Sequence, residues 1–304
     1  MLLNGLRVIC AFVVLMSGTA VAAETILVGG ATGRQGNAIV DELIERGYKV
    51  RGLTRNLDSK RAQRVAAKGI ELVQGDYGDP DSLLAAMQGI EQVFFYSGFS
   101  SNEIEEGNNV IAAAKASGVK HLIYSSGAAA APGNGMEGAA MMQVELAIVA
   151  SGVPYTVFRP VAFMENFDPL KADTVKNGFR DSRGPERMLY FIAIRDIGLF
   201  VAEAFENPDE WVGKALNIAG DMMTVSAYVA TVSRVMGREI AYHQLPLEEY
   251  LEIYPKPMRP LFRWYHAAGY SADVAGMRER YPSLTTLEQH LRKTGWENWT
   301  PAKN

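Results

Sequence analysis

The sequence predicts a doubly wound α/β fold around a parallel sheet, and two features carry this prediction. The first is a regular series of glycines that each end a helix-like stretch and open a β-rich run: Gly47, Gly69, Gly89, Gly118 and Gly152. Glycine is common at helix C-termini because it adopts the left-handed conformation there. The second is a glycine-rich turn between the first apolar run and a helical pattern. Strands and helices that alternate in this way form right-handed βαβ units and a parallel sheet.

The first half of the chain supplies the elements of this sheet in order. A strand over 25–29 opens the fold, and a helix over 38–46 follows the glycine-rich turn. Asp79, followed directly by proline, is a typical start for a short helix. Longer amphipathic helices are predicted over 102–117 and 136–151. With the β-rich run after each glycine, the pattern gives about six strands before residue 160.

After residue 160 the pattern is less regular. Helices are predicted over 196–206 and 225–236, and a strand over 215–218. The segment 178–185 has the composition of a loop, and 246–260 is a proline-rich segment with helical turns.

Composition excludes several classes of protein. The chain has 304 residues, of which 48% are hydrophobic and 21% are charged, as in an ordinary folded protein. The net charge of -4 gives no basic field for nucleic acid. Cys10 is the single cysteine and there are 4 histidines, so no metal site is expected. A Gly-x-Ser-x-Gly nucleophile motif is absent from the sequence.

Residues 1–23 have the three-part pattern of a secretory signal peptide. One positive charge in Met1–Arg7 is followed by the apolar run Val8–Met16 and then by small residues up to Ala23. The run is shorter than the roughly 18–20 residues of a spanning helix, so a transmembrane anchor is the weaker interpretation. The sequence therefore predicts export to the periplasm or the medium, with no transmembrane anchor after the segment is removed. If Met16 is the true start, the protein is cytoplasmic instead.

The glycine-rich turn is the strongest chemical signal. Gly30, Gly33 and Gly36 are spaced as Gly-x-x-Gly-x-x-Gly directly between a strand and a helix. Such glycines permit a tight turn, allow a pyrophosphate to approach the backbone and give close helix packing. The free N–H groups and the dipole of the helix N-terminus favour a phosphate at this place. The turn therefore predicts a dinucleotide-binding site.

Basic residues indicate which dinucleotide binds. A cofactor without a 2′-phosphate is usually held by an acidic residue about 20 residues past the glycines. Here Arg55 follows the second strand, the next acid is Asp58, and Arg34 lies inside the turn. Because guanidinium groups suit a phosphate dianion, Arg34 and Arg55 predict recognition of the NADP(H) 2′-phosphate. For Arg64 and Lys68, a solvated helix face is the expected location.

Several short segments together resemble one protein family. They are Gly30–Gly36, Thr54–Arg55, Gln74–Asp76, His121–Ser126, Pro154–Pro160, Phe163–Asn166, Ile194–Gly198, Gly213–Asp221 and Thr224. As a set they resemble the NmrA-like family of atypical short-chain dehydrogenase/reductases, which includes NADP-binding redox sensors and quinone reductases. The resemblance implies a Rossmann NADP-binding domain over 24–160. It also implies a smaller C-terminal substrate-side lobe over 161–304, partly interleaved with the sheet.

The resemblance also implies roles for single residues. At the phosphates these are Thr32, Gly33, Gln35 and Gly36 for the pyrophosphate and Arg55 for the 2′-phosphate. At the adenosine they are Asp76 and Tyr77 by the adenine, and Tyr96, Ser97 and Gly98 by the ribose and phosphates. Phe163 and Asn166 would flank the nicotinamide. A turn residue is the alternative for Asp76, and a cap of the following turn is the alternative for Asn166.

The catalytic side departs from the dehydrogenase pattern. None of the 13 tyrosines has a lysine four positions later, so Tyr-x-x-x-Lys, whose lysine lowers the tyrosine pKa, is missing. Many NmrA-like members carry a histidine and a lysine on the helix before the sixth strand, where this chain has Glu137 and Met141. Ser125 and Ser126 remain as polar groups at the end of the fifth strand, and a loop cap is their alternative role. Ser126 is thus a candidate and the catalytic residues stay unknown.

Other conspicuous residues have structural explanations. His121 lies inside an apolar run and is expected in the core. The aromatic stretch Trp264–His266 suits either a pocket for a planar substrate or core packing. Glu103, Glu105 and Glu106 are expected at a solvated helix start.

The sequence thus favours an NADP(H)-binding oxidoreductase that reduces a quinone-like or other carbonyl-type small molecule by direct hydride transfer. The alternative is a non-catalytic NADP(H) sensor that acts on a protein partner.

Overall fold

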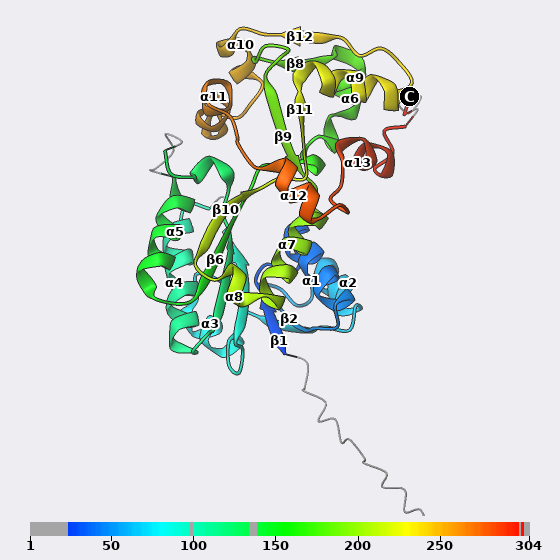
Figure 1. Cartoon of the computed structure of the whole chain (residues 1–304). Helices are drawn as coiled ribbons and strands as arrows, with labels where there is room; N and C mark the ends of the chain where they lie inside the picture. Colours follow the sequence, from blue (N-terminus) through cyan, green and yellow to red (C-terminus); the bar gives the residue numbers. More distant parts are fainter. Residues whose placement is uncertain (1–23, 98–99, 134–138, 298, 301–304) are drawn as a thin grey trace, which may run out of the picture.

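The computed structural model describes residues 24–97, 100–133, 139–297 and 299–300. They form a sheet covered by helices on both faces, with a second lobe beyond the carboxyl ends of the strands (Figure 1). The predicted signal peptide, Gly98 and Glu137 lie outside the described residues. Within the described ranges, every helix is too short or too polar to cross a membrane.

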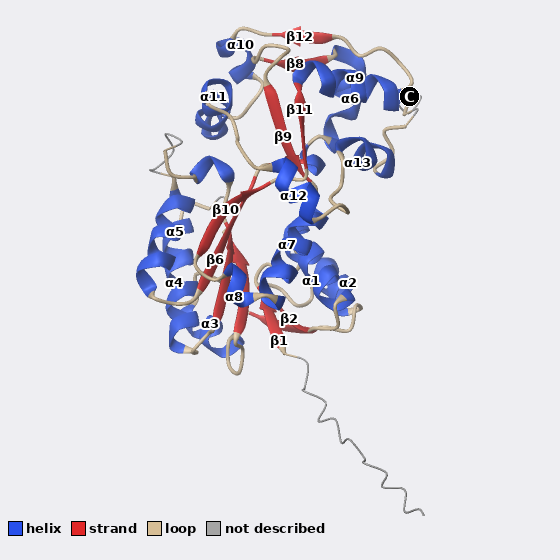
Figure 2. Cartoon of the chain, viewed as in Figure 1, coloured by secondary structure: helices blue, strands red, loops and turns tan. Residues whose placement is uncertain are grey.

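The central sheet has seven strands in the order β10-β6-β5-β4-β1-β2-β3, all paired in parallel (Figure 2). Its strands are β1 Thr25–Val28, β2 Lys49–Thr54, β3 Glu71–Gln74, β4 Gln92–Tyr96, β5 His121–Ser125, β6 Tyr155–Pro160 and β10 Lys214–Ile218. The strand order reverses between β1 and β4. Ligands of open α/β sheets bind at the carboxyl ends of the strands beside such a reversal. The predicted doubly wound fold is confirmed.

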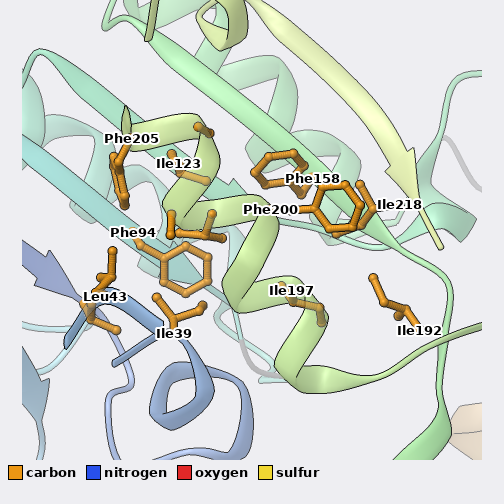
Figure 3. Close-up of a cluster of buried hydrophobic side chains, with 14 of the residues drawn as sticks. Ile39, Leu43, Phe94, Ile123, Phe158, Ile192, Ile197, Phe200, Phe205 and Ile218 are labelled. Carbon is orange, nitrogen blue, oxygen red and sulfur yellow. The ribbon is translucent and has the colours of Figure 1, made fainter. Parts of the chain in front are cut away.

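Two layers of helices cover the sheet. One face carries α1 Arg34–Glu45, α2 Lys60–Ala66, α7 Ile194–Glu206 and α8 Pro208–Trp211. The other face carries α3 Pro80–Ala86, α4 Glu103–Ala116 and α5 Ala140–Ser151. In Figure 3, Ile39 and Leu43 of α1 lie beside Phe94 of the sheet, and Phe200 of α7 lies beside Phe158. This packing fixes the start of α1 at the carboxyl edge of the sheet.

The glycines that predicted helix ends do adopt the left-handed conformation. From Gly47 to Gly152, their φ angles lie between 70° and 85°. The predicted start of α3 is also confirmed, because the Asp79 side chain accepts hydrogen bonds from the N–H groups of Asp81 and Ser82.

The second lobe is built on two small sheets. Its strands are β7 Ala162–Phe163, β8 Phe179–Asp181, β9 Met188–Ile192, β11 Asp221–Thr224 and β12 Tyr242–Gln244. Its helices are α6 Lys171–Asn177, α9 Val225–Met236, α10 Leu247–Glu252, α11 Arg259–Ala267, α12 Val274–Arg280 and α13 Leu287–Lys293. The strands pair in the orders β11-β9-β7 and β12-β8. The prediction of a loop over 178–185 is wrong at β8, because its partner β12 lies far away in the sequence and gives no local signal.

The second half of the chain also returns to the main sheet. Strand β10 pairs with β6, and α7 packs beside α1 in the same core cluster. The predicted division of the chain at residue 160 stays a prediction.

Candidate functional site

The glycine-rich turn leaves the N-terminus of α1 open to a ligand. Gly30 adopts a φ of 63°, and the N–H of Gly33 donates to the Gly30 carbonyl at 2.8 Å. Helix α1 starts at the next residue with Gly33 as its N-cap, and no side chain caps the helix there. Because the first N–H groups of a helix have no partner within it, this end is suited to an anion.

Tyr77 and Tyr96 pack against the glycine-rich turn. A Cβ atom at Gly33 would lie 2.1 Å from the Tyr96 hydroxyl, and one at Gly30 would lie 2.8 Å from the Tyr96 ring. A Cβ at Gly29 would lie 2.2 Å from the Tyr77 hydroxyl. Tyr77 and Tyr96, which the resemblance places by the adenosine, therefore pack against the turn and hold its backbone in place. Their contacts with a cofactor stay a prediction.

The third glycine of the motif packs against the turn itself. A Cβ at Gly36 would lie 2.3 Å from the Gly30 carbonyl oxygen. A side chain at this position would therefore push α1 away from the phosphate-binding backbone.

Arginines surround the open helix end. A hollow of about 480 Å³ is lined by Thr32, Gly33, Arg34, Asn37, Arg61, Arg64 and Val65. Burial raises the pKa of Tyr96, and the charges of Arg34 and Arg55 oppose this effect, so both guanidinium groups lie near the turn. A hollow with this lining fits a phosphate dianion.

Arg64 is exposed on α2, as expected, and it also lines the hollow beside the start of α1. Its position one helical turn after Arg61 could have indicated this shared face. The Lys68 ammonium is paired with Asp41 and donates to the Asn37 amide oxygen at 2.8 Å.

Asn166 lies at the phosphate end rather than in a helix cap. It is the last residue of a short 3-10 turn, Met164–Asn166, and its side-chain oxygen accepts a hydrogen bond from Arg34 at 3.3 Å. The capping alternative is therefore wrong, since Phe167 stands at the N-cap of the following turn. Phe163 is half-buried at the end of β7 and packs on the main core. Their nicotinamide contacts stay a prediction.

Asp76 occupies the turn that its alternative role requires. One carboxylate oxygen accepts the Gly78 N–H at 2.9 Å. The predicted contact of Asp76 with the adenine stays a prediction.

Buried polar groups lie at the end of β5, where the resemblance predicts the nicotinamide end of the site. Gln35 donates to the Ser125 hydroxyl, and both side chains are buried. The Ser126 N–H donates to the Phe158 carbonyl at 2.8 Å. The Ser126 hydroxyl is buried and has no hydrogen-bond partner among the described residues. The Gln35 side chain is thus engaged by Ser125, and the predicted contact of Gln35 with a pyrophosphate stays a prediction.

Met141 stands beside this strand end, where the family resemblance places a lysine. Its sulfur lies 3.2 Å from the position that a Cβ on Gly127 would occupy. A thioether supplies neither a proton nor a positive charge, so this position cannot perform the role of the lysine.

A buried carboxyl group, Glu103, is linked through Ser97 to Tyr124 of β5. The Ser97 hydroxyl donates to a Glu103 oxygen at 2.6 Å and lies 2.6 Å from the Tyr124 hydroxyl. Glu103 is only 5% exposed, so its predicted solvated position is wrong. Burial raises the pKa of Glu103, the Ser97 hydrogen bond opposes the rise, and Glu106 adds to it. Ser97 is thus already bonded to protein groups and is less available to a cofactor ribose.

The helical stripe of α4 contained the signal for this acid. Glu103, Gly107, Val110 and Ala114 are all buried and follow the spacing of one helix face. Because the first turn of α4 is rich in acids, its composition did not indicate that Glu103, the first of them, faces inward.

Two further predictions concern core residues. His121 is 1% exposed and bonds the Thr156 hydroxyl at 2.8 Å, as expected of a core histidine. Burial lowers the pKa of His121 to about 4. Trp264 is buried and packs on the rings of Tyr265 and Tyr270, which confirms core packing for this residue. The described residues contain no cluster of side chains suited to a metal ion.

The switch-point edge, the open helix end and the arginine hollow define a dinucleotide-binding α/β protein whose site fits a phosphorylated ribose. Residues 22–291 match the NmrA-like family, and the chain belongs to this family.

Named relatives and solved structures agree with this assignment. The chain is 28% identical over 268 residues to an NAD(P)H azoreductase of Xenophilus azovorans, covering 86% of this chain and 92% of the relative. It is 27% identical over 227 residues to quinone oxidoreductase 2 of Escherichia coli, covering 72% and 77%. The structure of Citrobacter sp. triphenylmethane reductase complexed with NADP(H) has the same fold, with a TM-score of 0.78 at 23% identity and coverage of 89% and 99%.

Proposed function

We propose that this protein is an NADPH-dependent oxidoreductase that passes a hydride directly to a quinone-like small molecule. The observation that carries the proposal is the difference between the two ends of the site. Arginines line the phosphate end, whereas Met141 stands where an acid–base pair would need a lysine. The names of the azoreductase and quinone oxidoreductase relatives support a reductase of small planar acceptors.

The residues of the chain would divide the work as follows. The turn of Gly30 and Gly33 and the start of α1 hold the pyrophosphate, and Arg34 and Arg55 hold the 2′-phosphate. Bound NADPH supplies the hydride. Buried Ser126, at the end of β5, is the hydroxyl that would face the reacting groups. This division follows the rule that open α/β sheets bind ligands along the carboxyl ends of their strands.

The acceptor class follows from the missing charged donor. Hydride transfer to a simple ketone creates an alkoxide, which needs a positioned acid or oxyanion donor during the transfer. A quinone gives a hydroquinone anion whose charge is delocalised and needs less assistance. The site is therefore suited to quinone-like acceptors and poorly suited to aliphatic carbonyls.

The test is NADPH oxidation with a panel of quinones. We expect saturable turnover that is lost in Gly33→Leu, because a side chain there meets the Tyr96 hydroxyl. Gly184→Ala is a control outside the glycine-rich turn, since nothing lies within 4 Å of a Cβ at Gly184 and its backbone is not left-handed. Saturable NADPH binding without turnover of any quinone would favour the sensor alternative.

We also propose that the protein is exported. The three-part pattern of residues 1–23 supports this, and the family match begins only at residue 22. Export separates the protein from the cytosolic cofactor pool, so an exported form would work with scavenged cofactor. N-terminal sequencing of the native protein from cell fractions tests the proposal. A cytosolic chain that starts at Met1 or Met16 would refute it.

A further inference from the structure

We propose that Glu103 is the proton source of this reduction and acts on the acceptor through the hydroxyl groups of Ser97, Tyr124 and Ser126. The inference rests on the proposed function. It assigns a role to the buried acid Glu103. The glycine motif does not require this acid, and the chain lacks the Tyr-x-x-x-Lys pair that would otherwise supply a proton.

The first part of the route is a continuous hydrogen-bonded chain. Ser97 stands between Glu103 and Tyr124, at 2.6 Å from an oxygen of each. A hydroxyl both donates and accepts, so either partner of such a bond can hold the proton. The Tyr124 ring is fully buried and stacks on Phe95 at 4.7 Å, which fixes the direction of its hydroxyl.

The second part of the route leads from Tyr124 to Ser126. Both residues lie at the end of β5, and their side chains share one side of the strand because strand side chains alternate. The Ser126 hydroxyl lies close enough to that of Tyr124 to act to lower the pKa of Tyr124, and no strong hydrogen bond to another described residue holds it, so it can turn between Tyr124 and an acceptor. Ser125, between them, is bonded to Gln35 and keeps the strand end in place.

The surroundings of Glu103 favour its protonated form more than water would. Within the described part of the chain, no lysine, arginine or histidine forms an ion pair with it. The charged group that acts on it is Glu106, a like charge on the same helix. Glu145 on the neighbouring α5 is neutralised by Arg159. The N-terminus of α4 favours the carboxylate and limits the rise in pKa, which keeps the group able to release its proton.

The proton route ends at Ser126, close to the position where the family carries the lysine that this chain lacks. Ser126 is followed by Gly127, against which Met141 packs at the position of the family lysine. A hydroxyl relay at this place would supply a proton without a charged side chain beside the nicotinamide.

The step balances in protons and electrons. The acceptor takes two electrons and one hydrogen as hydride, and its second oxygen becomes an anion. Ser126 gives its proton to this anion, Tyr124 gives one to Ser126, Ser97 to Tyr124, and Glu103 to Ser97. Glu103 is left as a carboxylate and regains a proton from water. The sum is NADPH, a proton and a quinone giving NADP⁺ and a hydroquinone. Because the proton follows the hydride, the relay does not activate an unreactive ketone.

The experiment compares Glu103→Gln with the matched control Glu105→Gln, an exposed acid in the same helical turn. We expect kcat with a quinone to fall about 10-fold or more in Glu103→Gln, at unchanged KM for NADPH, since positioned acids contribute roughly 10²–10⁴ to rates. Glu105→Gln should behave like the parent protein. Glu103→Asp should recover part of the activity, and Tyr124→Phe, which keeps the ring, should lose it.

The pH profile separates a relay from a structural role. The relay needs protonated Glu103, so kcat of the parent protein should be full below the raised pKa and should fall as pH increases through it. This fall should be missing in Glu103→Gln. Infrared difference spectra should show a protonated carboxyl band that Glu103→Gln removes.

The outcomes distinguish the relay from the proposed function. Parent-like kcat and pH profile in Glu103→Gln would overturn the relay and leave the oxidoreductase assignment intact. A parent protein that binds NADPH but reduces no quinone would overturn both. A missing carboxyl band at a pH where kcat is full would overturn the relay even in an active enzyme.

Discussion

The two ends of the candidate site are built on opposite principles. At the phosphate end, Arg34, Arg55 and Arg64 are exposed and stand around a rigid backbone turn. At the nicotinamide end, Glu103 and Ser126 are held inside the protein. The first end offers charge to a ligand from the surface, whereas the second keeps its polar groups away from water. The difference suggests that cofactor affinity and chemistry can be altered separately.

The same difference determines what each mutation costs. Exposed charges are screened by solvent and contribute little to folding. Buried charges are costly unless paired, so removing one partner destabilises the fold strongly.

The largest effect should come from the buried ion pair behind the nicotinamide end. Arg159 holds both oxygens of Glu145, with its Nε 3.0 Å from each, and the side chains are 11% and 5% exposed. Arg159→Met leaves the carboxylate buried and unpaired, so we expect a loss of about 3–5 kcal/mol in the free energy of unfolding. Urea denaturation measures it. The double variant with Glu145→Met should recover most of the loss, and a single variant as stable as the parent would contradict the contrast.

The phosphate end was largely predictable from sequence because its determinants are local. The glycines, the start of α1 and the capped start of α3 depend on residues within one or two turns of each other. Arg55 follows β2 directly, so its place at the carboxyl edge was fixed once the strand was recognised.

The rest depends on contacts between distant residues. The contact of Asn166 with Arg34 joins segments on two lobes, and β8 becomes a strand only beside β12. Glu103 belongs to a different case. Its helix was predicted correctly, but an acid at a helix start is usually solvated, and only the stripe that it shares with Gly107 and Val110 indicates burial.

The second prediction tests the phosphate end. A hydrogen bond to a charged group is worth about 1.5–3 kcal/mol, so Arg55→Ala or Arg34→Ala should weaken NADPH binding about 10-fold or more. NADH binding and the urea midpoint should stay unchanged, because both side chains are exposed. Lys68→Ala is a control in the same basic run, since Lys68 is already paired with Asp41. Titration with both cofactors measures the effect, and equal NADH and NADPH affinities in the parent protein would refute recognition of the 2′-phosphate.

The smallest effect should come from Met141, which packs against Gly127. Met141→Lys adds a cation beside Gly127, where we expect the nicotinamide ribose, while Met141→Leu changes shape without charge. A partly solvated charge contributes about 0.2–1 kcal/mol, so the lysine should tighten NADPH binding at most about fivefold, and the leucine should not. Aliphatic ketone reduction should stay absent in both variants, because a tyrosine to polarise the carbonyl is still missing. Quinone turnover should persist, since the relay from Glu103 does not pass through residue 141. Robust ketone reduction by the parent protein would show that a strong acid exists at the nicotinamide end, and the contrast between the two ends would then be wrong.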